Sequence, residues 1–351
     1  MKEPNDRSRS TVSPYVVSGL ICLLFGGTAG LSAQPLSGGS PPPALVDPSD
    51  HRPGMIVIDG AQVPYLDWGG TGVTLVFLAG AGNTAHVFDE FAPRFTDNYR
   101  VIGVTRVGFG ESGQPENNRG TDLASRVEHV RAVLDALQIP RAVLIGHSLG
   151  GDEITAFAGA YPERTAALIY LDSGIDHTAT MPISRDLAPL RGPAPQPDPA
   201  DLASPQAYQR FLTHVQGVEF PIGEVLATAV FDSTGAYLRP RVAPFAALAV
   251  INSIAPPDFT TVRAPALALF SDLTVETAAP WLEPDSEAYS QVAAFLEEEL
   301  QPALEAERVK FQNAVSDARV FAYWAHHHQF LSMPEDTERR IRQFLSSLGG
   351  L

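Results

Sequence analysis

From Met55 onward, short runs of β-branched and other apolar residues alternate with longer stretches in which apolar residues recur at helical spacing. This alternation predicts an α/β fold, with a mostly parallel central sheet and helices on both of its faces. Eight runs are expected to form the strands, at residues 55–58, 62–68, 74–78, 100–104, 142–146, 167–171, 266–270 and 319–323.

Three stretches carry the clearest helical pattern, at residues 122–137, 149–160 and 335–348. A fourth stretch, residues 285–315, is rich in Glu, Ala and Leu and predicts a long surface helix. Together with the strands, these helices account for most of the chain between residues 53 and 351, which we expect to form one α/β domain.

Residues 174–264 interrupt the alternation with about 90 residues that begin with many prolines. Short helical patterns follow at residues 206–218 and 223–231. An insertion of this size between two strands is typical of a helical cap or lid over the sheet. Four phenylalanines would either contact an apolar substrate group or form the lid's own small core: Phe211, Phe220, Phe231 and Phe245.

The first 33 residues have the layout of a secretory signal peptide. Lys2, Arg7 and Arg9 precede an apolar run at residues 15–25, and small residues follow up to Ala33. We expect export to the periplasm or the medium after cleavage, with no membrane span in the mature protein. A retained N-terminal membrane anchor is the alternative, because extending the run through Ala33 gives about 20 residues.

Residues 34–52 are rich in Gly, Ser and Pro and predict a flexible lead-in. Forty acidic residues against 24 basic ones give the chain a formal charge of -16. Because the basic residues are scattered, nucleic acid is excluded as a partner. The single cysteine, Cys22, excludes an intramolecular disulfide and a cysteine-based metal site. The sequence leaves the oligomeric state open.

The motif Gly146-His147-Ser148-Leu149-Gly150 lies between a predicted strand and a predicted helix. Such a turn needs strained backbone at Ser148, and the glycines remove Cβ atoms that would clash. Ser148 is thereby exposed at the carboxyl edge of the sheet, where the N–H of Leu149 faces a developing oxyanion. The motif predicts a nucleophilic serine; the alternative is a glycine-rich turn with an incidental serine.

This arrangement resembles the α/β-hydrolase superfamily over residues 55–348. The resemblance implies a second oxyanion donor in the loop after the third strand, Ala79-Gly80-Ala81-Gly82, so that Ala81 and Leu149 supply the two N–H groups. Ala79 replaces the histidine that is common in this family, and residues 105–112 match only part of the motif Asp-x-Arg-Gly-x-Gly-x-Ser. A serine at the turn disfavours the dehalogenase and epoxide hydrolase members, which use aspartate there.

Three adjacent histidines, His326, His327 and His328, precede Pro334 near the end of the chain. A serine nucleophile needs such a base at neutral pH. The resemblance places the base seven residues before the proline that opens the last helix, which selects His327, with His326 and His328 directed elsewhere. Adjacent histidines in an extended turn project in different directions, so we expect no metal ion at the triplet.

The acid that orients the base has two candidates. Asp172 ends the strand at residues 167–171, and Asp272 follows the strand at residues 266–270, where Thr274 occupies the position usual for the acid. We prefer Asp172, because it leaves a buried strand at a fixed place and because some members of the superfamily, including lipases, use that strand. The alternative role for Asp172 is to cap a turn.

These residues predict a serine hydrolase that cleaves an ester or related acyl bond of a small, partly apolar substrate through an acyl-enzyme. No cofactor and no metal ion are expected. Acyl transfer to an alcohol or cofactor-free perhydrolysis on the same triad is one alternative, and a non-catalytic binding protein is another. A dinucleotide site at residues 80–85 with Arg106 is a minor alternative, because no acidic residue ends the next strand.

Overall fold

The computed structural model describes residues 47–113, 119–241 and 244–349. The predicted signal peptide and most of the predicted lead-in lie outside these residues, so both stay predictions. Within the described ranges, each helix is too short or too polar to cross a bilayer.

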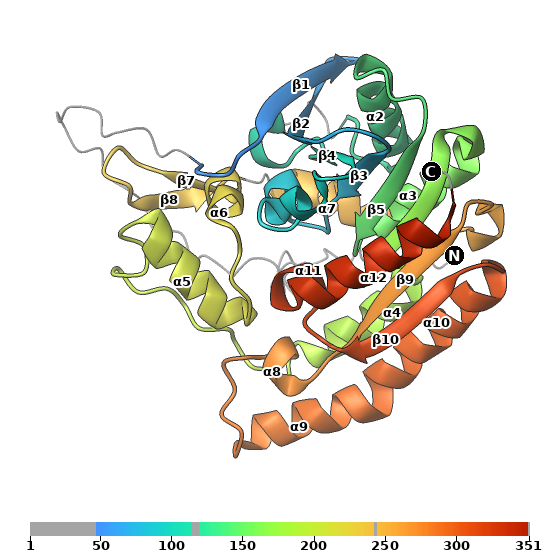
Figure 1. Ribbon diagram of the computed structural model, residues 1–351. Helices are drawn as coiled ribbons and strands as arrows, with labels where there is room; N and C mark the ends of the chain where they lie inside the picture. The colour runs from blue at the N-terminus through green and yellow to red at the C-terminus, as the bar shows by residue number, and fades with distance from the viewer. Residues whose placement is uncertain (1–46, 114–118, 242–243, 350–351) are drawn as a thin grey trace, which may run out of the picture.

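A central sheet of eight strands organises the molecule (Figure 1). Strand β2 is antiparallel to both of its neighbours, and all other pairs are parallel. The spatial order is β1 (Arg52–Ile58), β2 (Ala61–Gly69), β4 (Arg100–Val104), β3 (Thr74–Leu78), β5 (Ala142–His147), β6 (Thr165–Leu171), β9 (Ala266–Asp272) and β10 (Arg319–Trp324). All eight predicted strands are confirmed, as is the fold class.

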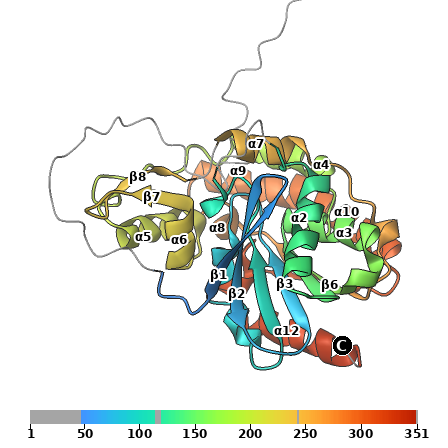
Figure 2. The same ribbon diagram turned by 90° about the horizontal axis from the view of Figure 1, so that it is seen from above.

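Alternate residues of the central strands point into two apolar layers. In β5, Val143 and Ile145 join the layer on one face, whereas Ala142 and Leu144 join the layer on the other. The first layer is closed by the 3₁₀ helices η2 (Ala85–Phe88) and η3 (Ala92–Phe95) and by α12 (Pro334–Ser347). The second is closed by α2 (Leu123–Ala136), α3 (Gly150–Ala160) and α10 (Gln301–Ala314). Figure 2 shows α2 and α3 together beside the sheet.

The predicted helices begin where their first residues satisfy free backbone groups. The side chain of Asp122 accepts a hydrogen bond from the Ser125 N–H at 2.9 Å and so caps α2. Helix α12 opens on Pro334, which lacks an N–H that the first turn would leave unpaired. These local signals explain why the predicted bounds of both helices agree with the structure to within one or two residues.

The predicted surface helix at residues 285–315 is confirmed as one continuous helical segment that contains a π-helical turn in its middle. Helix α9 (Glu287–Phe295) passes through a π-helical turn, Leu296–Leu300, into α10. Pro302, two residues after the end of that turn, has no N–H to donate to the carbonyl one turn earlier, so the hydrogen-bond ladder rearranges there.

The segment between β6 and β9 forms the helical cap that the sequence predicts. It contains α4 (His177–Leu187), α5 (Pro205–Gln216), α6 (Ile222–Thr228), β7 (Ala229–Phe231), β8 (Tyr237–Pro240) and α7 (Pro244–Asn252). The helix expected at residues 223–231 ends earlier than predicted, at Thr228, because Ala229–Phe231 pairs with β8 in a hairpin. The Asp232 side chain accepts hydrogen bonds from the Thr234 and Ala236 N–H groups and thereby closes this turn.

The phenylalanines of the cap that the structure describes pack among themselves and their neighbours. Phe211 is buried and stacks on Tyr208, and Phe231 meets Tyr208 edge to face. Phe220 lies edge to face on His328. The side chain of Phe245 lies outside the described residues.

Phe311 fastens α10 to the sheet, so its truncation is expected to destabilise the protein strongly. It is fully buried, with ring centroids 4.9 Å from Tyr170 and 5.1 Å from Phe259. Phe311→Ala is expected to lower the free energy of unfolding by about 3–5 kcal/mol, measured by urea denaturation. Val309→Ala, on the exposed side of the same helix, is the control and is expected to cost less than about 1 kcal/mol. Equal losses would contradict this account of α10.

Candidate active site

The turn between β5 and α3 has no room for side chains at either glycine. A Cβ on Gly146 would lie 2.5 Å from the Gly150 carbonyl oxygen, and a Cβ on Gly150 would lie 2.3 Å from the Leu78 carbonyl oxygen. Ser148 has a φ of 50°, which is the left-handed region that non-glycine residues rarely adopt. Its N–H donates to the Leu171 carbonyl at 3.1 Å, and its carbonyl accepts from the Ser173 hydroxyl at 2.6 Å. The strained conformation is therefore held from both sides.

A buried arginine supports the loop that follows β3. Arg106 Nη1 donates to the Gly80 carbonyl at 2.7 Å, and Nη2 donates to the Ala79 carbonyl. Arg106 Nε pairs with the Glu153 carboxylate, which also lies 2.9 Å from Arg126 Nε. Charge-assisted bonds of this kind, made away from water, fix the loop without the histidine that Ala79 replaces. Sequence reasoning missed this role of Arg106 and Glu153, because the partners are far apart in the chain.

His327 and Asp172 are in direct contact. His327 Nδ1 lies 2.5 Å from Asp172 Oδ2, and the other carboxylate oxygen of Asp172 accepts from the Ser271 N–H at 2.8 Å. Asp172 has a φ of 43°, a second strained residue at the carboxyl edge of the sheet. Asp272 instead pairs with Arg308 Nη2 at 2.6 Å. The geometry thus places the preferred acid, rather than its competitor, on the predicted base.

The two flanking histidines are buried and locked in neutral forms. His326 Nε2 donates to the Gln216 carbonyl at 2.8 Å, and its Nδ1 accepts from the His328 N–H at 2.9 Å. Burial lowers the pKa of His326 to about 4 and that of His328 well below its usual value. The His327 side chain is 36% exposed, so it is the member of the triplet that can exchange a proton with a substrate.

His147, the variable residue of the serine motif, steadies the histidine loop. Its Nε2 donates to the His327 carbonyl at 3.2 Å, and its ring lies 4.6 Å from the ring of His327. Burial and the neighbouring His327 keep its pKa well below the ordinary value, so it is uncharged. A Cβ on Gly80 would lie 2.9 Å from His147 Nδ1, which explains a glycine at that position.

Ser148, His327, Asp172, Ala81 and Leu149 all line one cavity of about 190 Å³. The structure thus brings every predicted site residue to the same place. The walls come from the cap, from the loop after β9 and from α10, and they are largely apolar: Ile175, Met181, Val215, Ile254, Leu273 and Trp281. None of the described cap phenylalanines lines this cavity, so they do not supply its apolar character.

The cavity also contains a histidine that sequence reasoning did not single out. His177, from the first turn of α4, contacts the buried Asp152 carboxylate through Nδ1 at 3.0 Å. Burial acts to lower the pKa of His177, but the Asp152 charge outweighs it and the pKa is raised. A second imidazole, held by a buried carboxylate, therefore lines the cavity. The sequence shows only a histidine after a probable cap residue, which gives no indication of this contact.

Part of the chain is similar in sequence to known proteins. Residues 73–207 match a family described as alpha/beta hydrolase fold. A protein of Mycobacterium phage D29 with the name "putative non-heme haloperoxidase" is 33% identical over 120 residues, which are 34% of this chain and 42% of the phage protein. A 2-hydroxy-6-oxononadienedioate/2-hydroxy-6-oxononatrienedioate hydrolase of Paraburkholderia phymatum is 39% identical over 118 residues, or 32% and 40% of the two chains. The chain therefore matches about two fifths of the length of these relatives.

The structural match is more extensive than the sequence match. The crystal structure of a carboxylesterase from Bacillus subtilis superimposes with a TM-score of 0.55 at 17% identity, covering 87% of this chain and 94% of that one. At this identity the likeness shows the fold alone.

The buried neutral His326 predicts a loss of stability in acid. Because its folded pKa of about 4 lies below the unfolded value near 6.5, the unfolded chain binds the proton first as the pH falls. The stability that neutral His326 contributes is fully present above pH 6.5 and is lost as the pH falls from 6.5 to 4. At pH 5 the loss of unfolding free energy is about 2 kcal/mol. In His326→Gln, the drop in unfolding free energy from pH 7 to pH 5 is expected to shrink by that amount, measured by urea denaturation.

The exposed His214 on α5 provides the control for this measurement, because His214→Gln is expected to leave the pH dependence unchanged. A His326→Gln variant with the wild-type pH dependence would show that burial of this histidine carries no such cost.

Proposed function

We propose that this chain, which has the α/β-hydrolase fold, is a serine hydrolase that cleaves an ester or related acyl bond of a small, partly apolar substrate. The proposal rests on one observation above the others, the contact of 2.5 Å between His327 Nδ1 and Asp172 Oδ2 at the rim of the cavity that Ser148 lines. A carboxylate in this place holds the imidazole in the tautomer whose Nε2 can accept a proton.

In the proposed reaction, the Ser148 hydroxyl oxygen attacks the substrate carbonyl carbon while His327 Nε2 takes its proton. The negative charge moves to the carbonyl oxygen, where the N–H groups of Ala81 and Leu149 stabilise it. The tetrahedral adduct then expels the leaving group, which receives the proton from His327, and an acyl-Ser148 ester remains. In the second half, water gives a proton to His327 and attacks the acyl carbon. The tetrahedral adduct then releases the acid as the bond to Ser148 breaks, and His327 returns the proton to the Ser148 oxygen.

The cavity favours a small substrate with an apolar group. Its volume of about 190 Å³ and its aliphatic and aromatic walls suit a short acyl or alcohol chain. His177, paired with Asp152, lies among these apolar walls and offers a hydrogen bond to a polar group of the substrate. We propose that the cap, rather than the catalytic turn, selects the substrate, because α4 and α7 both contribute to the cavity.

Perhydrolysis is the second candidate function. In that reaction hydrogen peroxide, instead of water, attacks the acyl carbon of the acyl-serine, and the acyl group is released as a peroxy acid. The similarity to proteins named as haloperoxidase and chloroperoxidase favours this candidate. Both reactions share the acylation half of the mechanism, so both require Ser148 and His327.

Labelling with a fluorophosphonate tests the nucleophile directly, since the probe phosphonylates only an activated serine. The full chain is expected to carry one adduct, on Ser148, located by mass spectrometry of peptides. Ser148→Ala is expected to lose the label, whereas Ser184→Ala, at another serine that lines the cavity, is expected to keep it. A folded protein that takes up no label, or carries it elsewhere, would refute the proposed nucleophile.

Substitution of the two candidate acids tests the pairing with His327. Asp172→Asn is expected to reduce kcat toward a p-nitrophenyl ester by about 10³-fold or more, because the amide cannot hold the imidazole in the required tautomer. Asp272→Asn breaks the contact with Arg308 and is expected to reduce kcat less than about tenfold. The opposite order of the two losses would move the acid to Asp272.

A further inference from the structure

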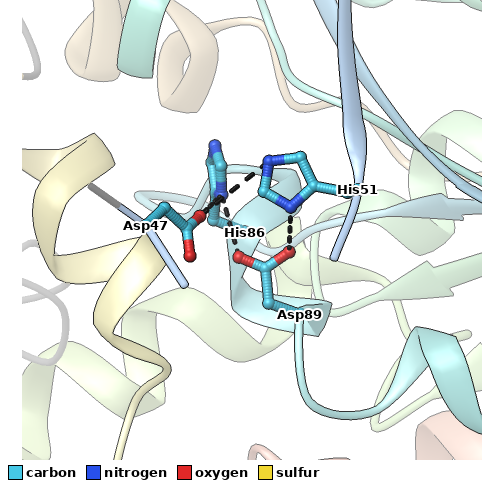
Figure 3. Close-up of side chains that lie close together, drawn as sticks. All are labelled: Asp47, His51, His86 and Asp89. Carbon is cyan, nitrogen blue, oxygen red and sulfur yellow. Dashed lines mark hydrogen bonds and ion pairs between the residues drawn. The ribbon is translucent and has the colours of Figure 1, made fainter. Parts of the chain in front are cut away.

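Four side chains outside the active-site cavity form a compact cluster of two imidazoles and two carboxylates. Asp47 and His51 lie just before β1, His86 lies in η2, and Asp89 follows η2. Figure 3 shows the four side chains pointing toward one another, and one possible ligand atom from each lies within 4.8 Å of the others. We call these four residues the His–Asp cluster. None of them lines the cavity around Ser148.

The His–Asp cluster brings two carboxylates together away from water. The Asp89 side chain is fully buried and that of Asp47 is 18% exposed. A Cβ on Gly223, in α6, would lie 2.4 Å from an oxygen of each carboxylate, so the helix backbone closes the space over both. Two like charges in such a place repel each other and require positive charge between them.

Hydrogen bonds among the described residues satisfy the cluster only in part. His86 Nδ1 makes its hydrogen bond to Asp89 Oδ2 at 2.8 Å and lies 3.0 Å from Asp47 Oδ2. Asp47 Oδ2 and His51 Nδ1 are both buried without a hydrogen-bond partner of suitable geometry in the described part of the chain. Both atoms make only ion-pair contacts within the cluster, at 3.0 Å for Asp47 Oδ2 and 3.4 Å for His51 Nδ1, and such a buried oxygen and ring nitrogen can serve as metal ligands.

The spacing of these atoms fits a tetrahedral ion. Ligand bonds of about 2.0–2.2 Å at tetrahedral angles place neighbouring ligand atoms about 3.4 Å apart. With one ligand atom taken from each residue, His86 Nδ1 lies 2.8 Å from Asp89 Oδ2 and 3.0 Å from Asp47 Oδ2, and His51 Nε2 lies 3.9 Å from Asp47 Oδ2, which bracket that value. The donor set of two nitrogens and two oxygens suits Zn²⁺ and similar ions, whereas Mg²⁺ and Ca²⁺ prefer oxygen alone.

We propose that the His–Asp cluster is a binding site for a divalent transition-metal ion such as Zn²⁺. With both imidazoles neutral, the two carboxylates and one divalent ion form a neutral unit. The Trp68 Nε1–H donates to Asp89 Oδ1 at 3.1 Å and orients that carboxylate, as outer partners do in metal sites.

The site would join two separate parts of the chain. Asp47 and His51 belong to the segment that precedes the sheet, whereas His86 lies in the short helix η2 that follows the oxyanion loop, and Asp89 comes directly after that helix. The same helix is held by Glu224, whose carboxylate accepts from the Thr84 N–H at 3.1 Å and from the Asn83 amide at 2.9 Å. The ion is therefore structural in this proposal: it fastens the N-terminal segment to the base of the loop and takes no part in the acyl chemistry.

Zinc titration of the metal-free full chain tests the proposal. After treatment with EDTA and its removal, the wild-type protein is expected to bind one equivalent of Zn²⁺ by isothermal titration calorimetry, and Zn²⁺ is expected to raise its midpoint of thermal unfolding. Asp47→Asn and His51→Gln are expected to weaken binding at least about tenfold and to abolish the rise. Both residues lie on the partly exposed segment before β1, so their substitution leaves the core intact.

His214→Gln is the matched control, because His214 is an exposed histidine of α5 outside the cluster. This variant is expected to bind Zn²⁺ like the wild type. The absence of stoichiometric binding by the wild type would overturn the proposal, and so would unchanged binding in Asp47→Asn and His51→Gln, which would place the ion at other histidines. Equal affinity for Ca²⁺ or Mg²⁺ would overturn the assignment to a transition metal. These results do not depend on the labelling of Ser148, so each proposal can fail without the other.

Discussion

The close approach of backbone at the turn between β5 and α3 is the constraint on which the rest of the site depends. Gly146 and Gly150 touch carbonyl oxygens at distances that leave no space for a Cβ, and Ser148 is forced into a left-handed conformation. The strain is sustained because β3 and β6, the neighbours of β5, supply the packing and hydrogen bonds that hold the turn. The site therefore requires a parallel sheet in which β5 has a neighbouring strand on each side.

Burial decides which charges the site retains. His147, His326 and His328 surround His327 but lie away from water, and each is held neutral. A buried ion pair remains where the partners are in contact, as between Arg106 and Glu153. Three neutral imidazoles beside one paired imidazole form an environment in which proton transfer is confined to a single ring.

Local patterns were sufficient for most of the fold and for part of the site. The eight strands are short buried runs, and helices such as α12 begin at residues whose capping role is visible in the sequence. The end of α6 was mispredicted because Ala229–Phe231 fits helix and strand equally well, and pairing with β8 decided it. Asp172 and Asp272 remained competitors for a similar reason, since each follows a strand and the contact of Asp272 with Arg308 is made across the fold.

The sequence by itself determined the fold class, the nucleophile motif and the positional choice of His327, because each depends on residues close together in the chain. Only the tertiary structure decided which aspartate faces His327, how Arg106 holds the oxyanion loop, and that His177 enters the cavity. The His–Asp cluster is likewise visible only in the tertiary structure, because its two halves are about 35 residues apart in the chain and neither half has the spacing of a known metal motif. Contacts between distant segments depend on the packing of the whole sheet, and a linear pattern carries no record of that packing.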